Sequence, residues 1–372
     1  MTAEVLVAGL GLIALLAYAV LGGADFGGGI WDLFASGARR REQRDAIAQA
    51  MGPVWEANHV WLIFVIVIIF SAFPLAYQAL SIALFVPFHF VLLGIILRGA
   101  AFVFRAYSPQ SARALGRPSA ATPAGGAPGP DDVRAGGASP ARPERARPWG
   151  VIFGVASTIT PVLLGMCLGA VSAGTLRLGE PGEVRIEGAA PWLTPVAWAI
   201  GALALALCAY LAAVFLANET GGELREDFRR RALLSGTAVV ALSVLALPLV
   251  RSEAPHLWDG LVGGRATPVL AVGIIAALLS GWFLRGRRYR AARVAAVTQI
   301  VALLTGWAVA QYPYLIYPDL TLAGAAAPRG VLVFVLWSTP AGMLLLLPSL
   351  WYLFRVFKGE HLSVRESAHP PD

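Results

Sequence analysis

The segment at residues 52–61, GPVWEANHVW, places a carboxylate, an amide and an imidazole at the head of a long apolar run. A charged side chain at mid-depth in a membrane helix costs about 2.5–3.5 kcal/mol, so its default interpretation is functional. Glu56 and His59 are three residues apart and share one helix face, whereas Asn58 and Trp61 share another by the same spacing. We therefore expect Glu56 to load and release protons, with His59 as its neighbour in a relay.

The protonation of Glu56 depends on where its helix begins. Pro53 suits the first turn of a helix, so we expect Glu56 within about one turn of the N-terminal end, where the helix dipole favours a carboxylate. Burial acts in the opposite direction and favours the neutral acid, and the balance leaves a group able to gain and lose a proton. The alternative is structural: Glu56 caps the helix or pairs with a partner subunit, and His59 is a hydrogen-bonded packing residue.

A second acidic segment, GGADFGGGIWD at residues 22–32, ends the first apolar run. We expect Asp25 to belong to the same proton path; alternatively, it ends the helix and accepts hydrogen bonds from loop amides. Asp32 either supports the motif or simply lies at the membrane interface. The run Gly27–Gly29 follows a membrane helix rather than a strand, which argues against dinucleotide binding. It indicates close backbone packing or a break in the helix.

The composition indicates a multi-pass membrane protein. Of the 372 residues, 57% are hydrophobic and 14% charged, with a mean hydropathy of +0.68, whereas soluble domains are about 45–50% apolar and about 25% charged. The net charge of +7 comes from arginines in short loops, which is typical of topology signals and not of nucleic-acid binding. Cys167 and Cys208 lie in apolar runs, so no disulfide framework or cysteine metal site is expected. We expect packing or interfacial anchoring from three tryptophans: Trp31, Trp55 and Trp61.

Apolar runs of about 20 residues predict an all-α, polytopic protein with about nine transmembrane helices. Arg98 lies deep in the third run, where it either snorkels to the cytoplasmic face or pairs with a carboxylate. The expected helix cores are 5–23, 54–74, 78–104, 150–173, 195–217, 232–250, 267–285, 293–312 and 331–356.

Arginine is concentrated in the connections that follow the odd-numbered helices. By the positive-inside rule the N-terminus lies outside and the C-terminus in the cytoplasm. Asp25 and Glu56 then both lie near the cytoplasmic face, with Asp25 closer to bulk water. The expected organisation is helices one to three with both acidic segments at 1–107, a disordered cytoplasmic linker rich in Pro, Gly, Ala, Ser and Arg at 108–148, helices four to nine at 149–357, and a cytoplasmic tail at 358–372.

The motifs GGADFGGGIWDLFA and GPVWEANHVWLIFVIVIIFSAFP together resemble those of subunit II of the cytochrome bd-type quinol oxidases. The histidine at its position in WEANHVW is similar to the pattern of the cyanide-insensitive branch of that family. The resemblance implies a subunit of a terminal oxidase in the bacterial cytoplasmic membrane, which oxidises quinol and reduces dioxygen to water. It implies that haem b and haem d belong to a partner, subunit I, and that subunit II contributes to a proton route from the cytoplasm. It also leaves room for small accessory subunits and for a structural quinone or lipid bound to this chain.

The number of histidines in expected membrane helices is consistent with haem binding by the partner subunit. Haem in a membrane needs inward-facing His or Met ligands, and only His59 and His89 lie in expected membrane helices, so we expect this chain to ligate neither a haem nor another metal. Two other functions stay open. The chain could be a secondary transporter that binds a cation or substrate at Asp25 and Glu56, although transporters place such sites at mid-membrane in paired halves. It could also be a purely structural subunit.

Overall fold

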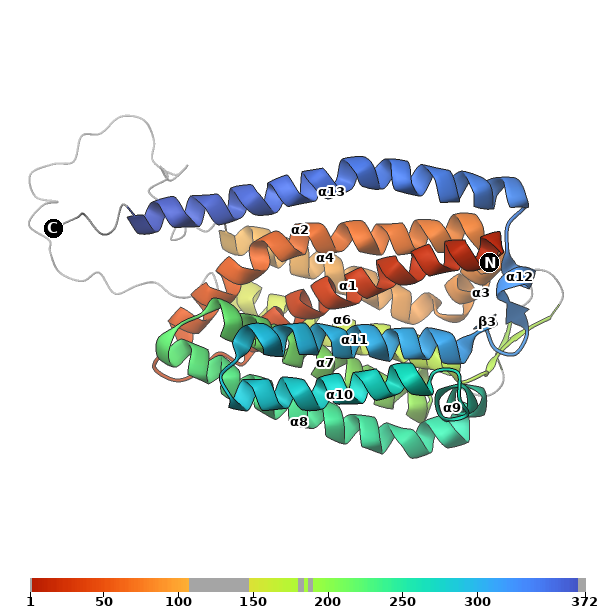
Figure 1. The fold of residues 1–372 in the computed structure, drawn as a ribbon, viewed down its shortest axis with the longest axis horizontal. Helices are drawn as coiled ribbons and strands as arrows, with labels where there is room; N and C mark the ends of the chain where they lie inside the picture. Colours follow the sequence, from red (N-terminus) through yellow and green to blue (C-terminus); the bar gives the residue numbers. More distant parts are fainter. Residues whose placement is uncertain (1, 107–146, 180–183, 187–189, 367–372) are drawn as a thin grey trace, which may run out of the picture.

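The computed structural model describes residues 2–106, 147–179, 184–186 and 190–366, and these residues are mostly helical (Figure 1). The expected linker at 108–148 lies outside the described residues except for its last two positions. The long helices are α1 (Ala3–Leu33), α2 (Arg40–Ala72), α4 (Phe85–Ala106), α6 (Arg147–Ser172), α7 (Pro195–Glu219), α8 (Gly222–Glu253), α10 (Thr267–Arg285), α11 (Tyr289–Gln311) and α13 (Arg329–Glu366).

Short elements complete the described chain. Strands β1 (Leu176–Leu178) and β2 (Val184–Ile186) form one antiparallel pair, and β3 (Tyr314–Ile316) and β4 (Leu320–Thr321) form another. The short helices are α3 (Pro74–Ala83), η1 (Pro191–Leu193), α9 (Pro255–Val262) and α12 (Leu322–Ala325).

Within the described residues, eight helices are long and apolar enough to cross a membrane, and the bent pair α2–α3 makes nine when counted as one span. The prediction of an all-α protein with about nine spans is therefore confirmed. Several helices extend beyond the apolar cores, because flanking polar residues such as those at 40–51 are good helix formers and continue the helix.

The expected third span at 78–104 is wrong at its start. A bend of 116° separates the described part of α2 from α3, and α3 in turn ends at Ala83, with Leu84 alone between it and α4. The bend has a local cause, because Pro74 is the first residue of α3 and disfavours a helical conformation at the residue before it. Phe73 accordingly has φ −135° and ψ 60°.

The long helices run side by side, and α1 lies within the bundle, where it packs against α2, α6 and α7 (Figure 1). The N-terminus, α3, α9, α12 and β3 lie at one end (right in Figure 1). The connections α1–α2, α7–α8 and α10–α11 lie at the other end, which we call the arginine-rich end; it comprises residues 34–44, 220–231 and 285–293.

Glycines allow α1 to approach its neighbours closely. A Cβ added at Gly27 would lie 1.9 Å from the backbone oxygen of Cys208 in α7, and one added at Gly29 would lie 2.1 Å from Oγ of Ser157 in α6. Because α1 continues without interruption to Leu33, the alternative of a helix break at the glycine run is wrong. The alternative of close backbone packing is confirmed.

This packing predicts that Gly27→Ala destabilises the protein. The added methyl would have to push α1 and α7 apart, and overpacking of this kind costs about 1–3 kcal/mol. The thermal midpoint of the detergent-solubilised protein, followed by size-exclusion chromatography after heating, should fall. Gly9→Ala is the matched control on the same helix, since a Cβ at Gly9 meets nothing within 4 Å. Equal midpoints for the two variants would contradict the close packing of α1 against α7 at Gly27.

Candidate functional site

A buried ion pair joins α1 to α4. Two nitrogens of the Arg98 guanidinium donate to the two carboxylate oxygens of Asp25, Nη1 to Oδ2 and Nη2 to Oδ1, both at 2.5 Å. Nη2 also donates to the backbone oxygen of Asp25 at 3.0 Å, and Nε donates to Oγ of Ser157 at 2.8 Å. The side chains of Asp25 and Arg98 are only 1% and 3% exposed. Arg98 therefore pairs with a carboxylate, and the snorkelling alternative is wrong.

Aromatic rings cover the guanidinium. The Cζ of Arg98 lies 5.0 Å from the ring centre of Phe26 and 4.9 Å from that of Phe153. A cation over an aromatic face is attracted by the ring quadrupole, most strongly where water is excluded. The rings, the carboxylate and the serine together replace the hydration that Arg98 would have in water.

Asp25 does not lie where the sequence placed it. It occupies an unbroken part of α1, eight residues and about 12 Å before the helix ends. The expectation that it lies close to bulk water is wrong, and so is the alternative that it ends the helix and accepts loop amides. The cause is the continuation of α1 through the glycine run, which carries the carboxylate into the bundle.

The second acidic segment lies inside α2, which begins at Arg40. The expectation that Pro53 and Glu56 occupy the first turn is therefore wrong, because the helix continues through residues 40–52. The side chains of residues 51–56, including Trp55 and Glu56, lie outside the described set. Asn58 is 2% exposed and packs on α1, where a Cβ added at Gly22 would lie 2.9 Å from its Oδ1. His59 and Trp61 are half-buried.

Asp32 lies one residue before the end of α1 and is buried at 1% exposure. Its carboxylate lies 3.8 Å from Nε of Arg44, and its backbone oxygen accepts two hydrogen bonds from the same guanidinium. Trp31 donates from its indole nitrogen to the backbone oxygen of Ala209 at 2.7 Å. This contact confirms a packing role for Trp31.

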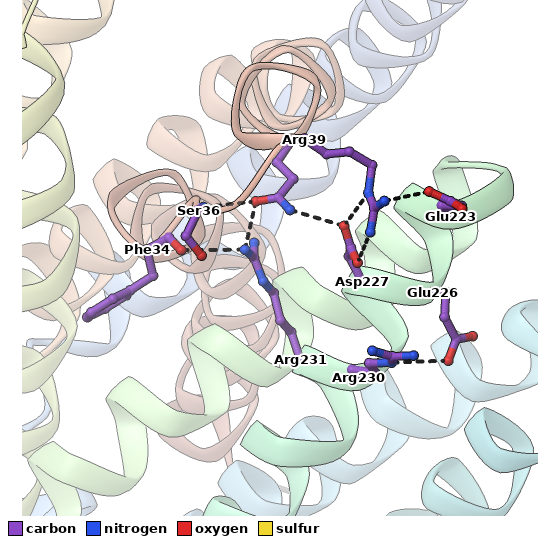
Figure 2. Close-up of polar contacts among 9 residues, drawn as sticks. Phe34, Ser36, Arg39, Glu223, Glu226, Asp227, Arg230 and Arg231 are labelled. Atoms are coloured by element: carbon purple, nitrogen blue, oxygen red, sulfur yellow. Dashed lines mark hydrogen bonds and ion pairs between the residues drawn. The ribbon is translucent and has the colours of Figure 1, made fainter.

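At the arginine-rich end, Arg39 connects the α1–α2 loop to the first turns of α8 (Figure 2). It donates to both carboxylate oxygens of Asp227, at 3.0 and 2.8 Å, and to Glu223 at 2.5 Å. The hydrogen bonds to Asp227 raise the pKa of the Arg39 guanidinium above its ordinary value. Gln43 donates to Asp227 and accepts from Arg231, which extends the network across the loop.

The sequence did not single out the residues that hold these groups in place. Ser157 and Asp227 have no local signal, since each lies far along the chain from its arginine partner.

Among the residues described, no group of three His, Cys, Asp or Glu side chains could hold a metal ion. The Nδ1 of His89 lies 2.7 Å from the backbone oxygen of Phe85, and the His89 ring lies against the Phe85 ring at 4.0 Å. His256 stacks on Tyr317 with ring centres 4.4 Å apart. The Nε2 of His256 is buried and has no hydrogen-bond partner among the described residues.

Comparison with known proteins gives a consistent result. Residues 3–123 and 138–357 match the family described as cytochrome bd terminal oxidase subunit II. A cytochrome bd menaquinol oxidase subunit II of Bacillus subtilis (strain 168) is 20% identical over 362 residues, which is 94% of each chain. Cytochrome bd-I ubiquinol oxidase subunit 2 of Escherichia coli (strain K12) is 24% identical over 63% of this chain and 53% of that protein.

The solved structure of bd oxidase from Geobacillus thermodenitrificans contains a chain of similar fold. The TM-score is 0.69 at 22% sequence identity, and the match covers 96% of this chain and 99% of that one.

The buried pair predicts a strong dependence of stability on its partner charges. Asp25→Asn leaves the Arg98 charge buried and unpaired, which costs about 3–5 kcal/mol, whereas the double variant Asp25→Leu with Arg98→Met removes both charges and should recover most of the loss. Thermal midpoints and the yield of solubilised protein measure both.

The matched control is Glu219→Gln, which breaks the partly exposed pair of Glu219 with Arg293 (3.2 Å). Exposed pairs contribute about 0–1 kcal/mol, so this variant should resemble the wild type. If Asp25→Asn were as stable as Glu219→Gln, the buried pair would not stabilise the bundle.

Proposed function

The chain belongs to the family of cytochrome bd terminal oxidase subunit II, and from this premise we propose that it contributes a proton path to its complex. The complex is a quinol:oxygen oxidoreductase of which this chain is one subunit. Reducing dioxygen to water consumes protons, and a path through the membrane must supply them. Glu56, His59 and Asp25 form the path in this proposal, which runs from the cytoplasmic side of the bacterial cytoplasmic membrane toward the partner, subunit I.

One observation supports this proposal above the others. Asp25 and Arg98 are charged groups held deep in an apolar bundle, next to the helix that carries Glu56 and His59. Charges at that depth are kept at a cost, and in membrane proteins they commonly mark proton and ion routes. Because two hydrogen bonds from Arg98 hold the Asp25 carboxylate, its proposed role is to be a fixed, ionised member of the path. Glu56 is then the group that gains and loses the proton.

The haems belong to subunit I in this proposal. Bound there, they supply the electron transfer and the reduction of dioxygen. The family match supports the presence of haem in the complex. Small accessory subunits and a structural quinone or lipid are further proposed partners.

Two other readings compete with the proton path. A purely structural subunit would hold its partner together and carry no protons, and substitutions at Glu56 separate it from the path. A secondary transporter would need Asp25 free to bind a cation, yet Arg98 already neutralises this carboxylate.

Glu56→Gln tests the path directly. The amide keeps the shape and hydrogen bonding of the acid but cannot titrate, so the complex should assemble with normal haem content and turn over about 10²-fold more slowly or worse. Glu56→Asp should retain more activity. Quinol-dependent oxygen consumption by the purified complex is the measurement, with Glu4→Gln in the first turn of α1 as control.

Full turnover of an assembled Glu56→Gln complex would overturn the path. Loss of subunit association or haem in this variant would favour the structural role instead.

The orientation is tested by labelling. In a variant without Cys167 and Cys208, Ala38→Cys probes the arginine-rich end and Arg265→Cys probes the opposite end; both positions are exposed. With the arginine-rich end in the cytoplasm, a membrane-impermeant maleimide added to whole spheroplasts should label only Arg265→Cys. Labelling of Ala38→Cys alone would reverse the topology and the direction of the proposed path.

A further inference from the structure

Two buried oxygen atoms near the ion pair have no hydrogen-bond partner. They are Oη of Tyr18 in α1 and Oδ1 of Asn58 in α2. Both residues are more than nine-tenths buried, with exposures of 8% and 2%. The atoms are unpaired within the residues that the structure describes.

The two oxygens lie on the same side of α1. Tyr18, Gly22 and Asp25 are separated by four and three residues and therefore share one helix face. The amide of Asn58 packs against Gly22, at the centre of this row, and a Cβ there would lie 2.9 and 3.1 Å from its Oδ1 and Nδ2. Asn58 of α2 thus packs at the centre of this row, one turn from Tyr18 on one side and one turn from Asp25 on the other.

Physical chemistry limits what these atoms can contact. A buried oxygen without a partner costs about as much as a lost hydrogen bond, so more than nine-tenths of buried polar groups are satisfied by protein or by ordered water. Internal waters typically make about three hydrogen bonds to such groups. An amide oxygen, a phenol and a carboxylate placed within one turn of Gly22 are partners that a buried water can use.

We propose that Tyr18 and Asn58 bind an ordered water between α1 and α2, beside the Asp25–Arg98 pair. The water accepts a hydrogen bond from the Tyr18 hydroxyl and donates one to Oδ1 of Asn58. Its second O–H then points toward the negative charge of Asp25. The hydration site stands independently of the proposed function, whereas its use as a step between the Glu56 helix and Asp25 rests on that function.

Cryo-electron microscopy of the intact oxidase complex, at a resolution that shows waters, tests the site. The wild-type map should contain a peak within hydrogen-bond distance of both oxygens. Tyr18→Phe keeps the ring and should weaken or remove the peak, and Asn58→Leu should remove it. Gln299→Leu is the control, because Gln299 of α11 is also buried with an Oε1 that has no partner among the described residues, and it makes none of the contacts described for the ion pair. A dry contact between Tyr18 and Asn58 in the wild type would overturn the proposal.

Turnover tests the use of the water. Asn58→Leu in an assembled complex should slow quinol-dependent oxygen reduction about tenfold, equivalent to about 1.4 kcal/mol, and should raise the solvent isotope effect in D₂O. Gln299→Leu should change neither. Wild-type rates for Asn58→Leu together with slow turnover of Glu56→Gln would remove the water from the path and leave the proposed function intact. A water peak together with full activity of Glu56→Gln would overturn the proposed proton path and leave the hydration site intact.

Discussion

The central constraint of this structure is that Arg98 is charged and lies where water is excluded. A guanidinium in that position needs a carboxylate and further acceptors, and Asp25 and Ser157 provide them. Four hydrogen bonds from three nitrogens use most of the five N–H groups of the side chain. Because the three residues lie on α4, α1 and α6, satisfying one charge sets the relative position of three helices.

The glycines of α1 follow from the same constraint. The backbone of α1 must approach α6 closely for Asp25 and Ser157 to reach the same guanidinium, and a side chain at Gly29 would collide with Ser157. The surroundings of the ion pair are also unequal. Phe26 and Phe153 cover the guanidinium, whereas the buried oxygens of Tyr18 and Asn58, one on the same face of α1 as Asp25 and one packed against Gly22, have no described partner. The site is therefore apolar around Arg98 and polar along this row of α1.

Much of the fold could be predicted from the sequence, because membrane solvation makes hydropathy a strong signal. Nine apolar runs correspond to the observed spans. The start of α4 could not be found in this way, since the break at Leu84 lies within an apolar stretch that hydropathy reads as uniform. The two acidic segments and Arg98 were recognised as unusual, but their depth depends on helix ends that hydropathy does not mark. Asp25 and Glu56 were placed too close to helix ends for that reason.

Pairings across the bundle were beyond the reach of the sequence alone. Asp25 and Arg98 are 73 residues apart, and Arg39 and Asp227 are 188 apart, so no local pattern connects them. A single chain offers several carboxylates to each arginine, and only packing selects among them. The sequence predicted that Arg98 either pairs with a carboxylate or snorkels. Close packing of α1 at its glycines brings Asp25 within reach of Arg98, and so the pair forms.

Helix α13 has a consequence of a practical kind. Its 38 residues make it about 57 Å long, whereas the hydrocarbon core of a bilayer is about 30 Å thick. It packs against α1 and α2, and its C-terminal turns extend past the other helices in Figure 1. A reporter domain fused after this helix would be held on a rigid spacer several turns away from the bundle. Such a fusion would leave the Asp25–Arg98 site untouched and would give an imaging fiducial whose direction follows the helix axis.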